Sequence, residues 1–278
     1  MAKKRLYISA DIEGVAGVVS SEHMSPAGFE YNQAREWYTA EVVAACNAAF
    51  DSGIDDIVVS DSHGNGQSLL IDKLPDNVQL VRSWPRPLCM MGGVDIGEYV
   101  GALLIGYHAG ASDLTGVLAH TLHGGAITEV RINGQVASET VISAATGAHF
   151  GVPVIMVSGD DAYIEHAQKV LPGVEGVITK WNSSFTSARM LKPVEVQRRI
   201  GEGVKAALSR LSSFKAEPLS GSIEVEISCV RRNGAELMAY LPCVERVNSH
   251  CIRFIGKDMV EVAKFLQFAI ASGGLTPK

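Results

Sequence analysis

The sequence predicts an α/β fold, with a mainly parallel sheet in an α/β/α layered core and a mixed region of strands and helices at the C-terminal end. Two observations lead to this prediction. Short apolar runs alternate with segments of helical periodicity along most of the 278 residues, as in proteins whose parallel strands are joined by helices. Beyond about residue 215 the pattern changes to strands of alternating polarity and one amphipathic helix.

The first elements are expected to form a β-α-β unit. Arg5 to Ala10 form an alternating strand pattern that stops at an acidic pair and a Gly-Val-Ala-Gly turn. Trp37 to Phe50 have helical periodicity with Ala-rich filler, and Asp51-Ser52-Gly53 closes this helix. Ile57 to Ser60 then make a short buried strand.

Two further buried strands, Ala102 to Gly106 and Val152 to Val157, extend the predicted parallel sheet. Between them, two strand-like segments, Ala126 to Ile132 and Val136, flank Asn133-Gly134. This dipeptide is typical of a type I′ turn, so an antiparallel ribbon is expected beside the sheet.

The second half of the chain begins with a helix, a strand and a longer helix, and it ends with two strands and a closing helix. The expected ranges are a helix from Asp160 to Leu171, a strand at 174–179, a Ser/Thr-rich loop at 182–187, a helix at 193–211, strands at 223–229 and 252–255, and a helix at 257–271.

The composition is that of a compact globular protein. Hydrophobic residues make up 47% of the chain and charged residues 19%, which argues against disorder. The 24 basic side chains are outnumbered by 30 acidic ones, the net charge is -6, and no basic run exceeds Lys3-Lys4-Arg5. A nucleic-acid partner is therefore not expected.

The sequence also argues against export and membrane insertion. Asp11 and Glu13 interrupt the apolar stretch that a signal peptide needs. The run from Val100 to Ile105 is far shorter than the roughly 20 residues that span a bilayer. Five cysteines without a C-x-x-C pair predict reduced, mostly buried thiols in the cytoplasm.

Asp11 and Glu13 are the first candidates for metal ligands. Residues i and i+2 of a strand point to the same face, so these two carboxylates are expected side by side at the end of a strand. They would repel each other unless a divalent cation lay between them, and carboxylates and imidazoles are common ligands for such ions. The alternative is the solvated start of a loop.

His63 and His108 each follow another buried strand, in Asp61-Ser62-His63 and Gly106-Tyr107-His108. Taken singly, each is more often a hydrogen-bonded loop residue than a ligand. Ligands of parallel α/β sheets bind at the carboxyl ends of the strands, however. Three separate segments therefore bring metal-binding side chains to one edge of the sheet.

His120 and Glu139 are further candidates. An imidazole can act as a base or stabilise charge near neutral pH, and His120 lies in Gly116-Val-Leu-Ala-His120. Glu139 opens a predicted helix, where the helix dipole already favours an acid.

Other chemistries have less support. The sequence contains no G-x-S-x-G, P-loop, G-x-G-x-x-G or H-E-x-x-H motif. Cys243, His250 and Cys251 do not have the spacing of a structural zinc site and fit the core of the C-terminal strands. The residues alone thus indicate metal-assisted hydrolysis and no more.

Six motifs occur together and in order: Asp11-Ile-Glu13-Gly-Val-Ala-Gly, Ser60-Asp-Ser-His63, Gly106-Tyr-His108-Ala, Gly116-Val-Leu-Ala-His120, Ile132-Asn133 and Gly159-Asp-Asp. Jointly they closely resemble the DppA-type zinc D-aminopeptidases, from about residue 6 to about residue 190 and more weakly in the final helix. The resemblance implies two zinc ions per subunit, held by Asp11, Glu13, His63, His108 and Glu139, with the aspartate bridging. It also implies a catalytic His120, described in the family as a nucleophile, and a homodecamer of two stacked five-membered rings.

The activity implied by the resemblance is hydrolysis of the N-terminal residue of short peptides or amino-acid amides, including those with D-residues. The chain departs from the best-known member in the loop at Ser112 to Thr115 and in Val136-Ala-Ser before Glu139, and both segments are expected to shape the substrate pocket. Residues 1–190 are interpreted as the metal-binding catalytic core, and residues 191–278 as a C-terminal region that packs on the core and assists oligomerisation.

Two alternatives remain open. Another dinuclear metallohydrolase, an amidase or a phosphoesterase, would use the same ligand types. A non-catalytic protein that binds peptides or metal would need no residue like His120 at the edge of the sheet.

Overall fold

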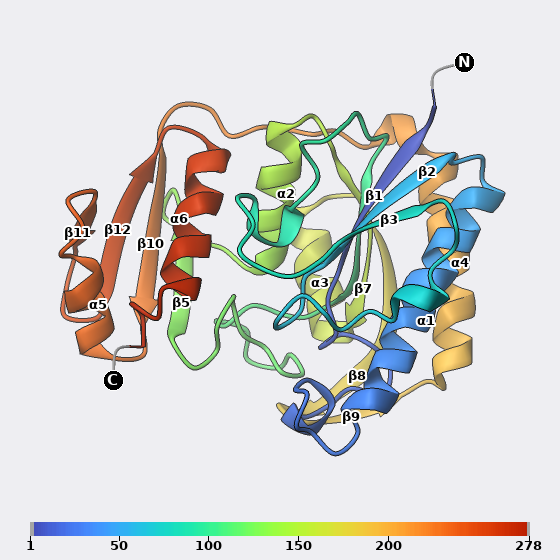
Figure 1. Ribbon diagram of the computed structural model, residues 1–278, viewed down its shortest axis with the longest axis horizontal. Coiled ribbons are helices and arrows are strands. Elements are labelled where there is room, and N and C mark those ends of the chain that lie inside the picture. The colour runs from blue at the N-terminus through green and yellow to red at the C-terminus, as the bar shows by residue number, and fades with distance from the viewer. Residues whose placement is uncertain (1–2, 277–278) are drawn as a thin grey trace.

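A computed structural model describes residues 3–276 and contains two β-sheets (Figure 1). The larger sheet has seven strands in the order β3-β2-β1-β4-β7-β8-β9. Neighbouring strands are parallel except at the edge, where β9 is antiparallel to β8. The strands are β1 (Arg5–Ala10), β2 (Asp56–Asp61), β3 (Val78–Val81), β4 (Ala102–Tyr107), β7 (Val154–Asp160), β8 (Glu175–Ser184) and β9 (Ser187–Met190). The predicted mainly parallel sheet is confirmed.

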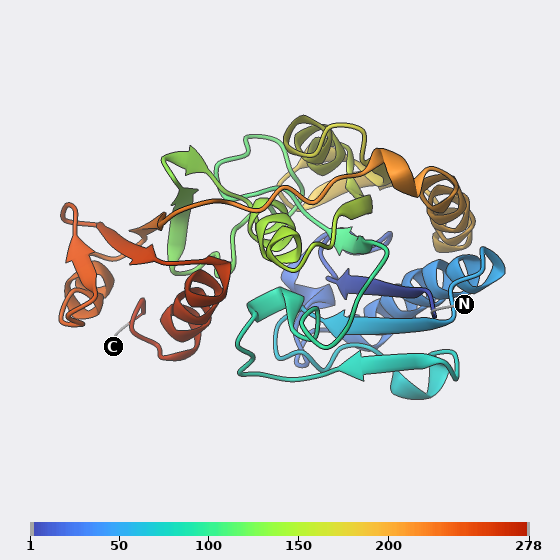
Figure 2. The same cartoon turned by 90° about the horizontal axis from the view of Figure 1, so that it is seen from above.

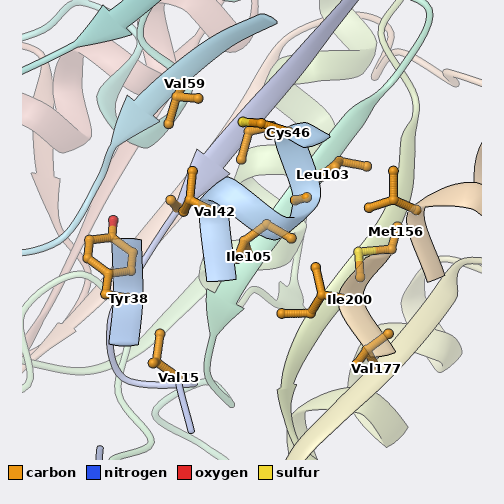
Figure 3. Packing of buried hydrophobic residues seen from close by; sticks show 14 of the residues in the cluster. Val15, Tyr38, Val42, Cys46, Val59, Leu103, Ile105, Met156, Val177 and Ile200 are labelled. Atoms are coloured by element: carbon orange, nitrogen blue, oxygen red, sulfur yellow. The ribbon is translucent and has the colours of Figure 1, made fainter. Parts of the chain in front are cut away.

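Helices cover both faces of this sheet. On one face lie α1 (Tyr31–Asp51) and α4 (Pro193–Ser209), which pack against each other. On the other lie α2 (Glu139–His149) and α3 (Asp161–Val170). Figure 3 shows the core under α1 and α4, where side chains of both helices meet those of the central strands. Burial of each such aliphatic side chain contributes about 1.5–3 kcal/mol.

The smaller sheet has five antiparallel strands in the order β11-β12-β10-β5-β6 and lies beside the larger one (Figure 2). Its elements are β5 (Ile127–Ile132), β6 (Gln135–Val136), β10 (Ile223–Cys229), β11 (Val244–Arg246) and β12 (Cys251–Gly256), with helices α5 (Arg232–Met238) and α6 (Met259–Ala271). Asn133 and Gly134 join β5 to β6 with φ angles of 49° and 78°. These positive angles are those of a type I′ turn, so the predicted hairpin is confirmed.

Some details differ from the sequence-based expectations. The predicted loop at 182–187 is too long, because β8 continues to Ser184, β9 begins at Ser187 and only Phe185 and Thr186 form the turn between them. This hairpin lies at the edge of the sheet, where polar side chains can stay exposed in a strand. The short elements β3, α5 and β11 were not predicted, since each is too short to show a period. The described residues also contain 3-10 turns at Ser21–His23, Ile71–Lys73, Cys89–Met91 and Leu211–Ser213.

The two sheets interleave along the chain. The β5–β6 hairpin belongs to the smaller sheet although it precedes α2, α3, β7 and β8 of the larger unit. Conversely, α4 lies beyond residue 190 and packs on the larger sheet. The division into a catalytic core of residues 1–190 and a C-terminal region of residues 191–278 that assists oligomerisation therefore stays a prediction.

The cysteines are free thiols, and four of the five are buried, in line with the prediction of mostly buried thiols. Cys251 lies in the core, but Cys243 and His250 are exposed, so the expectation that these two residues belong to the core is wrong. Within residues 3–276 no helix combines the length and the apolar character needed to cross a bilayer.

Candidate metal centre

The candidate ligands gather at the carboxyl edge of the larger sheet. Asp11 follows β1, His63 follows β2 and His108 follows β4, and these three strands are neighbours in the order β2-β1-β4. Glu139 is the first residue of α2, next to the N-cap residue Ser138. All four side chains are buried, as is that of Glu13. The sequence-based expectation that these residues come together is met by the fold.

Two glycines allow the ligand-bearing segments to approach each other. The amide of Gly14 donates to the carbonyl of Gly106 at 2.7 Å. A Cβ atom on Gly14 would lie 1.9 Å from the carbonyl oxygen of Tyr107, and one on Gly106 would lie 2.2 Å from that of Asp11. Since a side chain fits at neither position, glycine is required for the segment after β1 to lie against the end of β4.

The carboxylates and imidazoles interleave at short range. Nδ1 of His63 lies 3.0 Å from Oε2 of Glu13 and 3.3 Å from Oδ1 of Asp11. Nε2 of His108 lies 3.4 Å from Oδ2 of Asp11 and 3.6 Å from Oε2 of Glu139. Asp11 is therefore central, with one oxygen toward each histidine.

Backbone carbonyls fix the orientation of all three histidines at the site. His63 donates from Nε2 to the carbonyl of Met24 at 2.8 Å. His108 donates from Nδ1 to the carbonyl of Ala109 at 2.9 Å, and His120 donates from Nδ1 to that of Leu118 at 2.8 Å. In each ring the other nitrogen faces the cluster, where its lone pair can bind a metal ion once the ring is neutral, which is the arrangement found around metal-bound histidines.

The electrostatics of the cluster reflect this crowding of opposite charges. Burial alone would lower the pKa of His63 and His108, but the neighbouring carboxylates outweigh burial and raise both pKa values well above the usual range. Burial would likewise raise the pKa of Asp11, but the neighbouring imidazoles of His108 and His63 hold that pKa well below its usual range. Asp11 is thus kept ionised and needs positive charge next to it.

A divalent cation fits this donor set. Asp11, Glu13 and His63 present ligand atoms within 4.8 Å of one another, and so do Asp11, His108 and Glu139. Nε2 of His108 is buried and has no hydrogen-bond partner in the described part of the chain, which is costly unless another group satisfies it. Two imidazoles and carboxylate oxygens are ligands that suit zinc.

His120 lies directly beside this cluster. Its ring stacks on that of His108 with centroids 4.1 Å apart, and its Nε2 lies 3.9 Å from Oε1 of Glu139. Leu118 and Leu122, two residues to either side, adopt positive φ angles of 56° and 64°. Such left-handed conformations cost about 1–3 kcal/mol each and cluster at functional sites. His120 also forms a ligand group with Glu13 and His108, so its position suits either catalysis or metal binding.

A cavity of about 420 Å³ opens over the cluster, which is within the usual range for small-molecule sites. Asp11, Glu13, His63, His120 and Glu139 line its floor. The other residues that line it were not predicted from the sequence. They include Trp84, Met90, Leu122, and Gln267, Ile270 and Ala271 of α6. No local pattern could have identified these residues, because they meet only through the packing of α6 against the larger unit.

Comparison with known proteins gives concordant results. A family model described as D-aminopeptidase matches residues 4–268. A D-aminopeptidase of Bacillus subtilis is 30% identical over 260 residues, which cover 92% of this chain and 93% of that protein. The solved structure of the Zn-dependent D-aminopeptidase DppA from Bacillus subtilis, described as a self-compartmentalizing protease, superposes with a TM-score of 0.93 at 27% identity and covers 99% of both chains.

Proposed function

The chain belongs to the D-aminopeptidase family, and from this premise we propose that it is a zinc-dependent aminopeptidase acting on short peptides or amino-acid amides. The observation that carries the proposal is the cluster of Asp11, Glu13, His63, His108 and Glu139, four of which line a cavity large enough for such substrates; His108 lies buried behind them. The solved relative is described as zinc-dependent, which supports zinc as the metal.

We further propose two zinc ions in each chain. Asp11, Glu13 and His63 would hold one ion, and Asp11, His108 and Glu139 the other. Asp11 belongs to both groups, and its two oxygens face different histidines, which supports a bridging role. Bound zinc supplies Lewis-acid polarisation of the scissile carbonyl and lowers the pKa of a bound water.

His120 is the proposed catalytic residue. Its Nδ1 proton is used by the carbonyl of Leu118, so the lone pair on Nε2 faces the cavity and the oxygens of Glu139. From this position Nε2 can attack the carbonyl carbon or accept a proton, and as imidazolium it can stabilise the tetrahedral oxyanion. The cavity gives a short peptide room to bind beside this nitrogen.

The activity is tested with a panel of D- and L-dipeptides, amino-acid amides and phosphoesters, assayed on metal-depleted protein before and after zinc is added. We expect peptides or amides to be hydrolysed only with zinc, a preference for an N-terminal D-residue, and about two zinc ions per chain by elemental analysis. Turnover of phosphoesters in place of peptides would favour the rival hydrolase, and a chain that binds zinc without any turnover would favour a binding protein. No transition metal after zinc reconstitution would remove the basis of the proposal.

The related structure is described as self-compartmentalizing, and we propose that this chain forms a homodecamer of two stacked rings of five. Several large apolar side chains are exposed on the single chain, among them Leu114 at 97% and Phe29 at 89%, and contacts between subunits would cover such groups. Size-exclusion chromatography with light scattering is expected to give a mass near ten times that of one chain. A monomer at all working concentrations would contradict this assembly. A cytoplasmic location also stays a prediction.

A further inference from the structure

We propose that Lys180 is a positioning residue of the metal centre: it fixes the backbone of residues 13–18 and thereby the carboxylates of Asp11 and Glu13. The inference rests on the proposed zinc site. Lys180 lies on β8 and donates hydrogen bonds to backbone carbonyls, not to the carboxylates or imidazoles of the candidate ligands.

The ammonium group of Lys180 is fully buried and is surrounded by backbone carbonyls. Nζ donates to the carbonyl oxygens of Glu13, Val15 and Val18. An ammonium has three N–H donors, so these contacts use its whole hydrogen-bonding capacity. One side chain therefore ties together three points of the segment that follows β1.

The same segment receives two more side-chain contacts. Thr179, the neighbour of Lys180, donates from Oγ1 to the carbonyl of Gly14 at 2.5 Å. Glu41, buried on α1, accepts a hydrogen bond from the amide of Ala16 at 2.9 Å. The segment lies outside the strands and helices and is held by turn hydrogen bonds and by the bond from Gly14 to Gly106. Side chains from β8 and α1 therefore help to define its path.

Burying the charge of Lys180 costs free energy, which indicates that its hydrogen bonds to this segment have a function. Burial lowers the pKa of Lys180 to about 8, against the opposing effect of Asp160, Glu41 and Glu13. Within residues 3–276 the hydrogen-bond partners of Lys180 Nζ are carbonyl oxygens, and no carboxylate lies at ion-pair distance, although buried charges are expensive without one. An apolar side chain would avoid that cost but would donate to none of these carbonyls, and only that of Val15 would keep a backbone donor, the amide of Val18.

The effect on the metal follows from geometry. Zinc–ligand distances in protein sites vary by only about 0.2 Å, so small shifts of a ligand matter. Glu13 is a candidate ligand, and its own backbone carbonyl accepts a hydrogen bond from Lys180. Residues that orient ligands from outside the metal's own coordination typically change metal affinity by about 10- to 100-fold when they are mutated. Lys180 is expected to fall in this range.

The test compares the zinc affinity of wild type and Lys180→Met by competition with a chelator, alongside the thermal unfolding of each metal-free protein. Methionine is similar in length but has no N–H donors. We expect zinc affinity to fall about 10- to 100-fold. Val177→Ala is the matched control, because Val177 lies buried on the same strand and contacts the core. It should lower the unfolding temperature and leave zinc affinity unchanged.

The outcomes are distinct. Equal zinc affinity in wild type and Lys180→Met would overturn the inference and leave the proposed function intact. A wild type that binds no zinc would overturn both. If Lys180→Met does not fold, Thr179→Val carries the test, because it removes only the hydrogen bond to Gly14. Its zinc affinity should fall by about 2- to 10-fold, the range for one hydrogen bond, and no change relative to Val177→Ala would overturn the inference.

Discussion

Replacing His108 by alanine is expected to remove at least one zinc ion from each chain and to abolish most of the turnover. His108 is 1% exposed, and its Nε2 lies between Asp11 and Glu139 with no hydrogen-bond partner in residues 3–276. Alanine would remove the imidazole that lies between these two buried carboxylates, leaving His63 as the imidazole beside Asp11 and His120 as the one beside Glu139. Since loss of a residue that merely orients a ligand costs about 10- to 100-fold in affinity, loss of a ligand should cost more.

The measurement is zinc per chain by elemental analysis together with the rate of peptide hydrolysis. His149→Ala is the matched control, because His149 is an exposed histidine at the end of α2 and lies outside the cavity. It should retain both zinc and activity. A His108→Ala protein with full zinc content would show that His108 is not a ligand.

Replacing His120 by alanine is expected to lower kcat by about 10²-fold or more while leaving zinc content nearly unchanged. This loss is typical when a general base or an oxyanion-stabilising group is removed. His120 is more accessible than His108, with 23% of its side chain exposed, and it faces the substrate cavity. Zinc remains because the two ligand groups built on Asp11 do not include His120.

The same two measurements separate the possible roles of His120. Loss of zinc together with activity would make it a metal ligand, in line with the group that it forms with Glu13 and His108. Full activity with full zinc would make it an ordinary loop histidine. A drop in kcat at constant zinc supports the catalytic assignment.

The sequence predicted the sheet and most of the cluster for a specific reason. Buried strands have a local pattern, and in a parallel sheet their carboxyl ends meet at one edge, so Asp11, His63 and His108 could be placed together before any contact was known. Glu139 was different. An acid at the start of a helix is expected from the helix dipole alone, so the local sequence did not indicate a ligand, and only the family resemblance identified Glu139 as one.

The remaining features depend on contacts between distant segments. The left-handed backbone at Leu118 and Leu122 has no signature in the sequence, because leucine rarely adopts it. Lys180 stood just beyond the predicted end of a strand, and nothing local distinguishes a lysine that turns into the core from one that faces solvent. Gln267 lies on a helix whose amphipathic pattern does not reveal that it borders the cavity.

The pairing of β5 with β10 has a consequence for how the protein is made. A nascent chain that has emerged only as far as α4 already contains all the candidate ligands, and its larger sheet can form. The β5–β6 hairpin that leads into Glu139 would still lack β10, its other neighbour in the sheet, and a two-stranded hairpin alone is marginally stable in water. Helix α6, which borders the cavity, would not yet have been synthesised. The hydrolytic centre is therefore completed only after α6 has been synthesised.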